Sequence, residues 1–215
     1  MKILAVEFSS EQRGVAIAAD GRGFDAVTET APRVTRAFGL IEEALKNAGL
    51  EREDVECIAL GIGPGSYTGI RAAIALAQGW QLATGVKLLG IGSVECLAAQ
   101  AQALGWFGKV SFVIDAQREE LYFARYEISA DSRREISALR LASLEEVRAG
   151  VSPGEIIAGP EVRRWFAEGR ESFPGAETLA RLAGERSDFI AGEKVEPIYL
   201  RETNFVKAPP PRTVS

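Results

Sequence analysis

The segment from residue 57 to residue 84 constrains the fold most, because it joins a strand, a tight turn and a helix of small residues. Residues 57–62 form an apolar run of the length of a strand. A Gly-Pro-Gly turn follows, after which the hydroxyl of Ser66 or Thr68 can cap a helix over residues 69–84. The rest of the chain can be built around this strand-turn-helix unit.

The predicted helix carries apolar residues on two sides. Its small residues recur at spacings of three and four and therefore share one stripe, while a bulkier set lies on the opposite side. A helix that is apolar on both sides is either wholly buried or serves an interface. Both hypotheses stay open, and Trp80 is a plausible anchor in the second. The stripe consists of Ala72, Ala75, Gly79 and Ala83, and the bulkier side consists of Ile70, Ile74, Ala77 and Gln81.

The two halves of the chain repeat one pattern. Each half begins with an apolar strand that ends in a carboxylate, continues with two further strands and then turns helical. Strands that alternate with helices imply a mainly parallel sheet, to which a hairpin adds an antiparallel part. We therefore predict an α/β protein with two duplicated lobes. The first lobe is expected over residues 1–104, and a smaller second lobe with an extended C-terminal tail over residues 105–215.

Turn and cap signals divide the halves into elements. Asp20-Gly21 predicts the turn of the first hairpin. Ser93 and Ser143 are expected to cap the helices that follow them, with Glu146 completing a capping box after Ser143. The helices are predicted over residues 33–48, 69–84, 94–104, 144–149, 161–168 and 176–191. Residues 195–201 are expected to be extended, and 208–212 to be frayed.

The composition excludes several classes of protein. The chain has no histidine and only two cysteines, which removes His-dependent nucleophiles, His general bases and zinc sites built on imidazole or many thiolates. A net charge of −5 argues against strong binding of nucleic acid by this chain alone. Cys57 and Cys96 lie in apolar patterns typical of buried free thiols. With no signal peptide or membrane span in the sequence, we expect a cytoplasmic protein without a metal site.

The strand-end carboxylates Glu7 and Asp115 allow two interpretations. In the first, they face a cleft between the lobes together with Ser9 and hold Mg²⁺ with a nucleotide. In the second, each carboxylate accepts hydrogen bonds from backbone N–H groups at the end of its strand. We favour the second interpretation.

The glycine-rich turn also allows several interpretations. It can cradle a phosphate at the N-terminus of the next helix, but no Lys-Ser or Lys-Thr follows the glycines, so it is not a Walker A loop. The simpler interpretation is a tight turn with an N-cap. Arg71 lies near the helix N-terminus, where its charge opposes the helix dipole. We therefore expect a carboxylate partner for Arg71, within the chain or across an interface.

Four stretches of the chain match a known family together. The most specific is Gly-Pro-Gly-Ser-Tyr-Thr-Gly-Ile-Arg, from Gly63 to Arg71, and the others begin at Ile3, Val113 and Glu196. Over nearly the whole chain they resemble the TsaB (YeaZ) family of bacterial tRNA-modification proteins. That family has the actin-like ATPase fold, in agreement with the duplicated lobes expected from the sequence pattern.

The resemblance implies a non-catalytic subunit that binds a catalytic homologue, TsaD, and works with an ATPase, TsaE. Their complex transfers a threonylcarbamoyl group to N6 of adenosine 37 in tRNAs that read codons beginning with A. The resemblance also implies no cofactor of the subunit's own, since ATP and Mg²⁺ belong to the partners. Because the predicted docking surface is apolar, we expect homodimers through the same helices when the partner is absent. The negative net charge predicts tRNA contact only through the complex.

Two features depart from the family pattern. Glu7 stands where the family usually has Asp, and residues 32–35 stand where a histidine is common. Both departures weaken the case for nucleotide chemistry. In the first, the extra methylene of Glu7 moves its carboxylate away from a preorganised metal-phosphate geometry. The catalytic homologue also needs paired histidines for its metal, and this chain has none.

From residues and resemblance together we predict a docking element and a vestigial nucleotide cleft, with no catalytic residue. Alternative functions are a weak Mg-nucleotide-binding ATPase or kinase relative and, with almost no chemical support, a metallopeptidase. Helix 33–48 is expected to share the docking surface. The predicted partner-binding residues are Gly63, Pro64, Gly65, Ser66, Tyr67, Thr68, Gly69, Arg71, Ala72, Ala75, Leu76, Gly79, Trp80 and Ala83, and the cleft residues are Glu7, Ser9 and Asp115.

Overall fold

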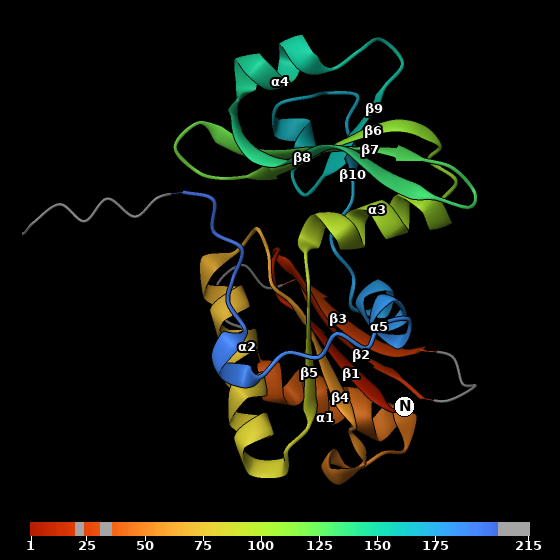
Figure 1. Cartoon of the computed structure of the whole chain (residues 1–215), viewed down its shortest axis with the longest axis vertical. Coiled ribbons are helices and arrows are strands. Elements are labelled where there is room, and N and C mark those ends of the chain that lie inside the picture. Colours follow the sequence, from red (N-terminus) through yellow and green to blue (C-terminus); the bar gives the residue numbers. More distant parts are fainter. Residues whose placement is uncertain (20–23, 31–35, 202–215) are drawn as a thin grey trace, which may run out of the picture.

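The computed structural model describes residues 1–19, 24–30 and 36–201, which form two lobes, each built on a mixed sheet of five strands (Figure 1). The strand order is β3-β2-β1-β4-β5 in the first sheet and β8-β7-β6-β9-β10 in the second. The shared order confirms the predicted duplication. The strands are β1 Ile3–Glu7, β2 Gln12–Ala18, β3 Phe24–Thr30, β4 Cys57–Gly61, β5 Lys87–Ile91, β6 Gly108–Asp115, β7 Glu120–Ile128, β8 Arg133–Ser143, β9 Ile156–Gly159 and β10 Arg170–Glu171.

Pairing within each sheet follows the predicted pattern. The central strands β1 and β6 pair antiparallel with the strand that follows them and parallel with β4 and β9. β1 and β4 are buried along their whole length, as expected of central strands covered on both faces. The strands β2 and β3 pair from Gln12↔Thr30 to Ala18↔Phe24 and form the expected hairpin. Its predicted Asp20-Gly21 turn lies outside the described residues.

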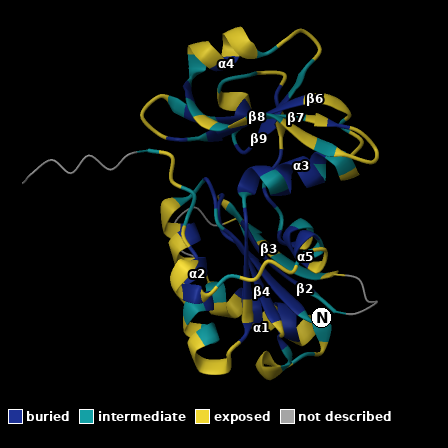
Figure 2. Cartoon of the chain, in the orientation of Figure 1, coloured by how far each residue is buried: buried dark blue, intermediate teal, exposed yellow. Residues whose placement is uncertain are grey.

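Helices cover both faces of the first sheet (Figures 1 and 2). On one face, α1 and α2 pack over Leu4, Val6 and Leu60. On the other face, α5 packs over a flatter surface that includes Ala5, Ala16 and Ala59. The helices are α1 Ala37–Ala48, α2 Tyr67–Thr84, α3 Ser93–Ala103, α4 Leu144–Gly150 and α5 Ala176–Gly184, and the 3₁₀ turns are η1 Arg52–Asp54, η2 Val162–Arg164 and η3 Gly192–Lys194.

The last helix of each half packs on the sheet of the other half. Helix α3 follows β5 but contributes Leu97 and Ala101 to the core of the second sheet. Helix α5 follows β10 but contributes Leu179 and Ala183 to the core of the first. The sequence-based division placed residues 105–215 in the second lobe, and the packing of α5 corrects that assignment. Amphipathic periodicity shows that a helix has a buried face, but it cannot show which sheet receives that face.

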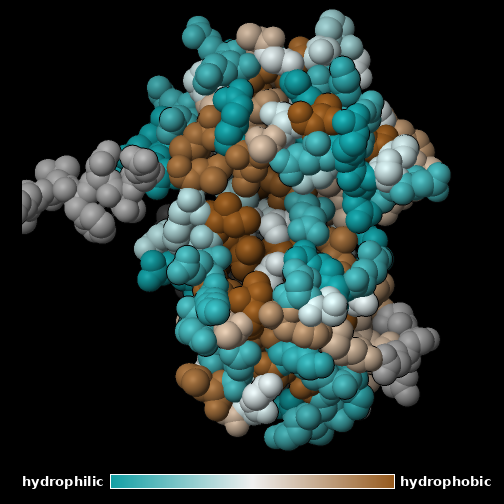
Figure 3. All heavy atoms as spheres, viewed as in Figure 1, coloured by the Kyte–Doolittle hydropathy of each residue, from teal (hydrophilic) through white to brown (hydrophobic). Residues whose placement is uncertain are grey.

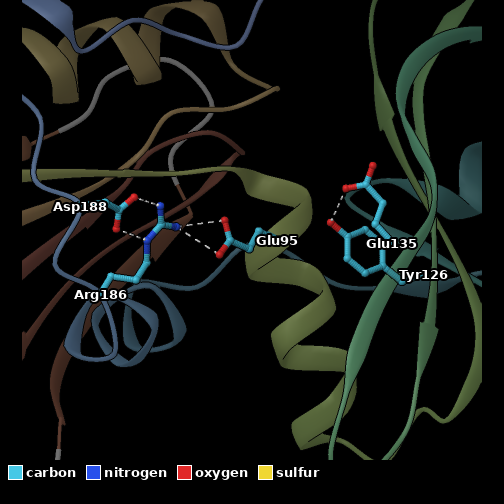
Figure 4. Close-up of polar contacts among 5 residues, drawn as sticks. All are labelled: Glu95, Tyr126, Glu135, Arg186 and Asp188. Atoms are coloured by element: carbon cyan, nitrogen blue, oxygen red, sulfur yellow. Dashed lines mark hydrogen bonds and ion pairs between the residues drawn. The ribbon is translucent and has the colours of Figure 1, made fainter.

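An ion-pair cluster reinforces the contact between these two helices. Arg186, just after α5, donates from Nη1 to both carboxylate oxygens of Glu95 on α3, at 3.2 and 3.3 Å (Figure 4). The same guanidinium binds Asp188 through Nε at 2.9 Å and Nη2 at 2.5 Å. On the other side of α3, Tyr126 donates to Glu135 at 3.2 Å between β7 and β8. Polar and apolar contacts therefore both hold α3 between the lobes.

Several predicted helices differ in extent from the observed ones. The helix predicted over residues 161–168 is only the short 3₁₀ turn η2, and the one predicted over 176–191 ends at Gly184. Ser93 is the first residue of α3 and not its cap. The capping box of Ser143 and Glu146 is confirmed. Residues 33–35 and 208–212 lie outside the described part of the chain, and among the described helices none is both long and apolar enough to cross a bilayer.

Candidate functional site

The glycine-rich turn between β4 and α2 is held against the ends of two other elements. The amide of Ser66 donates to the Ser9 carbonyl at 2.6 Å, and the amide of Ser93 donates to the Gly63 carbonyl at 2.7 Å. A Cβ on Gly65 would lie 2.0 Å from the Ser9 carbonyl oxygen, so only glycine permits this approach to the end of β1. The turn therefore fixes where α2 begins.

Ser66 is the residue that caps α2. Its side-chain oxygen accepts a hydrogen bond from the amide of Gly69 at 3.4 Å, while the helix begins at Tyr67. Of the two hydroxyls that the sequence offered, the structure uses this one, and Thr68 lies exposed on the first turn. The helix ends with Gly85 in the left-handed conformation, which closes its last turn.

One side of α2 is buried and the other is exposed, as the interface hypothesis for this helix requires. The bulkier side packs on the sheet, with Ile70 and Ala77 nearly or fully buried. Gln81 belongs to this side but serves polar contacts, donating to the Val86 carbonyl at 3.0 Å. The small-residue stripe is exposed along its length and does not pack on the protein's own sheet. It consists of Ala72, Ala75, Gly79 and Ala83.

An apolar groove of about 420 Å³ runs between α1 and α2 beside this stripe. Phe38 on α1 is 67% exposed and lines the groove. Trp80 is half-buried, packs on the core and presents its remaining surface to the groove. Leu82 on α2 is 91% exposed. Neither Phe38 nor Leu82 is among the predicted partner-binding residues. The apolar character of Leu82, out of phase with the buried face of α2, was a usable signal, whereas Phe38 lies in phase with the buried Ile41 of α1.

The strand-end carboxylates satisfy backbone groups, as we favoured. Glu7 Oε1 accepts from the amide of Ser9 at 2.7 Å, and Asp115 Oδ1 accepts from the amide of Gln117, also at 2.7 Å. Each bond reaches two residues along the chain, so the two lobes use the same device. Asp115 also forms an ion pair with Arg164 at 3.2 Å.

Glu7 is fully buried and turned away from solvent. Its Oε2 has no hydrogen-bond partner among the described residues, and its carboxyl lies so close to Gly61 that a Cβ there would be 2.0 Å from Oε2. Burial raises the pKa of Glu7 from 4.5 to about 7, and hydrogen bonds from Ser9 oppose that shift. Burial raises the pKa of the nearby Cys96 thiol, and the charge of Glu7 adds to this effect.

A cleft of about 600 Å³ separates the lobes beside the start of α2. Ser9 and Asp115 line it, but Glu7 does not. Figure 3 shows apolar side chains gathered over the junction of the lobes on one face of the molecule. No group of three or more acidic or thiol side chains within the described residues could hold a metal ion. The arrangement does not fit a nucleotide-bound Mg²⁺ held between Glu7 and Asp115, because one carboxylate is inside the lobe and the other is occupied by Arg164.

Arg71 has an aromatic partner on its own helix. Its Nη1 donates to the Tyr67 hydroxyl at 2.7 Å, and its guanidinium carbon lies 5.0 Å from the centre of that ring. The predicted carboxylate partner is not seen among the described residues. The ring and hydroxyl of Tyr67 thus hold a cation at the helix N-terminus, where the dipole alone would disfavour it.

The structure brings part of the predicted docking element together on one surface. The stripe from Ala75 to Ala83 lines the groove beside α1, whereas Gly65, Ser66 and Tyr67 border the interlobe cleft and Gly63, Pro64 and Gly69 are buried. The predicted cleft residues do not converge in the same way, because Glu7 is separated from the cleft that Ser9 and Asp115 line.

Comparison with known proteins yields one consistent relationship. Residues 32–201 match the family model described as TsaD, tRNA N6-adenosine threonylcarbamoyltransferase. The chain is 29% identical to the tRNA threonylcarbamoyladenosine biosynthesis protein TsaB of Escherichia coli, covering 94% of this chain and 95% of the relative. It is 28% identical to the protein of the same name from Haemophilus influenzae, covering 97% and 98%. The solved structure of YeaZ from Pseudomonas aeruginosa superposes with a TM-score of 0.81 at 27% identity, covering 93% of this chain and 99% of that one.

Two lobes with the same strand order, flanked by helices and separated by a cleft, define a two-lobed α/β protein with duplicated sheets. The family match covers most of the chain, and the relatives match over nearly their whole length. The chain belongs to the family described by the TsaD model, and within it to the TsaB/YeaZ proteins.

Proposed function

We propose that this protein is a non-catalytic subunit for threonylcarbamoyladenosine modification of tRNA, and that it docks onto a catalytic homologue of the TsaD type. The observation that carries the proposal is the exposed stripe of α2 beside the apolar groove with α1. The names of its relatives supply the pathway. A TsaE-type ATPase, ATP and Mg²⁺ enter through the partners in this proposal, and tRNA is bound by the complex.

The chemistry of the docking surface supports a helical partner. Small residues on α2 let another helix approach closely, while Phe38 and Trp80 offer large apolar surfaces at the groove. Apolar surface that a monomer leaves exposed marks an interaction site. Because a homologue of the same fold carries equivalent helices, a second copy of this chain fits the surface in the same way. We therefore expect homodimers when the catalytic homologue is absent.

Substitution of Gly79 tests the docking surface directly. Gly79→Arg places a long charged side chain in the middle of the stripe, where a Cβ meets nothing within 4 Å in the monomer. We expect the fold to be retained and affinity for the catalytic homologue to fall by at least about 30-fold, the effect of a hot-spot residue. Ala149→Arg is the matched control, since Ala149 is an exposed helical residue on α4 in the other lobe. Equal affinity of both variants in titration calorimetry would remove α2 from the interface.

Reconstitution tests the functional part of the proposal. Threonylcarbamoyl transfer to tRNA is measured with the catalytic homologue and the ATPase, with and without this chain. We expect modification to require the chain and to be lost with Gly79→Arg but not with Ala149→Arg. Equal modification in the presence and absence of the chain would exclude an activating role.

The rival function, an ATPase or kinase that uses Glu7 and Asp115, finds no support in their geometry. Glu7 is buried away from the cleft and Asp115 is engaged by Arg164. Titration calorimetry with ATP and Mg²⁺ separates the two functions, and we expect no binding heat from the isolated chain. The chain has no histidine, so the metallopeptidase interpretation also lacks its usual ligands.

A further inference from the structure

The last described segment, residues 190–201, runs over the first lobe before it reaches the second. We call it the C-terminal strap. At its start the Ile190 amide donates to the Leu88 carbonyl on β5 at 2.9 Å. Gly192 then exchanges two bonds with α2, donating to Gln81 Oε1 at 2.7 Å and accepting from Gln78 Nε2 at 2.8 Å. In Figure 1 the strap (blue) passes in front of β5 and continues beside α2.

The middle of the strap is anchored at the N-terminus of α2. The Ile198 amide donates to the Ile62 carbonyl at 2.9 Å, directly before the glycine-rich turn. The Tyr199 ring then stacks on Tyr67, the first residue of α2, with ring centres 5.7 Å apart. Burial raises the pKa of the Tyr199 hydroxyl and a bond from Arg71 opposes this. Arg71, Tyr67 and Tyr199 are therefore one cluster.

The end of the strap is anchored in the second lobe. Arg201 Nη2 donates to the carbonyls of Ala116 and Gln117, at 3.2 and 3.3 Å, and pairs with the carboxylate of Glu120. These acceptors belong to the turn between β6 and β7. Residues 117–119 of this turn are three successive non-glycine residues with φ of 62°, 57° and 63°. Left-handed backbone costs on the order of 1 kcal/mol per residue, so this turn depends on outside contacts more than an ordinary one.

The anchors lie on a different side of the molecule from the other junction between the lobes. Helices α3 and α5 join the lobes through Glu95 and Arg186, and α5 covers one face of the first sheet. Helix α2, to which the strap is fixed, covers the opposite face. The strap borders the interlobe cleft, since Tyr199 and Arg201 line it together with Tyr67 and Gln117.

We infer that the C-terminal strap is an interlobe latch: Tyr199 and Arg201 tie the N-terminus of α2 to the β6–β7 turn and fix the opening of the cleft. With the latch intact, contacts on both sides of the first sheet hold the lobes at one angle. Without it, the α3–α5 junction remains and acts as a hinge. This device belongs to the isolated chain and does not rest on the proposed function.

Distance measurements between the lobes test the latch. Spin labels are placed at Lys46→Cys on α1 and Asp131→Cys in the β7–β8 turn, both exposed positions, and single-cysteine variants report any labelling of the buried Cys57 and Cys96. We expect one narrow distance distribution in the parent and a broader, shifted one in Arg201→Ala and Tyr199→Ala. Arg134→Ala is the matched control, because its exposed ion pair with Glu127 lies within one lobe. A parent-like distribution in Arg201→Ala would overturn the inference.

Hydrogen exchange gives a second measurement on the same variants at the turn itself. The amides of Ala116 and Glu120 are bonded across the turn, to Glu120 and Gln117. We expect their exchange to become about tenfold faster in Arg201→Ala, with Tyr199→Phe close to the parent because it keeps the stacked ring. Unchanged exchange in Arg201→Ala, or equal exchange in Tyr199→Phe and Tyr199→Ala, would contradict the latch. A melting curve like that of the parent shows that the variants fold.

Discussion

The two lobes follow the same strand pattern but build different elements after the fourth strand. β4 and β9 hold the same place in their sheets, and a glycine-proline pair follows or ends each of them, at Gly63-Pro64 and Gly159-Pro160. β4 leads into α2, a helix of 18 residues, whereas β9 leads into η2, a turn of three. The duplication therefore kept the sheets and allowed the helices to diverge.

The difference begins at the first residues after each proline. Ser66 caps α2 with its side chain, but Glu161 at the equivalent point of η2 is left-handed, with φ of 55°, and makes no side-chain cap. The apolar residue of η2, Val162, is fully buried, while α2 leaves a whole stripe exposed. Of these two elements only α2 exposes an apolar stripe, and this stripe is where we propose that the partner docks.

The strand-end carboxylates of the two lobes share one backbone hydrogen bond but differ in environment. Each accepts from the amide two residues further on. The Asp115 side chain is 21% exposed and paired with Arg164, whereas the longer Glu7 reaches inward against Gly61 and is fully buried. The longer Glu7 side chain thus lies outside the cleft that Asp115 lines.

Substitution of the turn glycines is expected to have the largest effect on stability. It tests whether the turns after β4 and β9 are structurally equivalent in the two lobes. A Cβ on Gly65 would lie 2.0 Å from the Ser9 carbonyl oxygen, and one on Gly159 would lie 1.9 Å from the Val113 carbonyl oxygen. Both residues also have φ near 150°. We expect Gly65→Ala and Gly159→Ala each to lower the free energy of unfolding by about 3 kcal/mol or more, because backbone cannot yield to the added methyl. Denaturant unfolding measures this, and a mild effect in one lobe only would break the structural equivalence of the turns.

The buried carboxyl of Glu7 in the first lobe is expected to make the free energy of unfolding depend on pH, with an effect of comparable size. Because the pKa of Glu7 is raised to about 7 in the fold from an ordinary 4.5, the native state binds a proton that the unfolded state loses. The stabilisation is fully present below pH 4.5, falls as pH rises to about 7 and is then gone, a change of about 3 kcal/mol. Unfolding free energies measured from pH 4 to 8 check the slope.

Two amide variants assign this slope to one lobe. Glu7→Gln cannot titrate, so the Glu7 part of the slope is expected to vanish. Asp115→Asn removes the ion pair with Arg164 in the other lobe, but it leaves the Glu7 slope in place. A slope that survives in Glu7→Gln would mean that another group binds the proton.

Much of the fold follows from sequence because periodicity and turn chemistry are local. The strand-turn-helix from residue 57 to 84, the hairpin pairing and the capping box at Ser143 were each predicted from neighbouring residues and are observed. The exchange of α3 and α5 between the sheets was not predicted, because it depends on which surface is left uncovered after the strands assemble. The helix predicted after Pro160 is replaced by the short turn η2, which begins after the left-handed residue Glu161.

The candidate site, like the fold, could be predicted from the sequence only in part. The exposed stripe follows from helical spacing once the opposite side is assigned to the core, and its four residues face outward as one hypothesis required. Phe38 lies three residues before the buried Ile41, so helical spacing alone does not mark it as an exposed residue. The role of Arg201 depends on contacts between segments more than 80 residues apart, such as its pair with Glu120. No local pattern contains such contacts.

The smallest effect is expected from Gly79→Ala, and it separates folding from docking on the same helix. Gly79 is exposed in the interior of α2, and a Cβ there meets nothing within 4 Å. Alanine is therefore expected to raise the free energy of unfolding by about 0.5–1 kcal/mol through helix propensity alone. If a partner helix packs closely against the stripe, the same methyl weakens the complex while it stabilises the monomer. Thermal melts and calorimetric titration with the catalytic homologue measure the two quantities. A variant that gains stability and binds as tightly as the parent would show that the closest approach of the partner lies elsewhere on the groove, nearer to Phe38 and Trp80 than to Gly79.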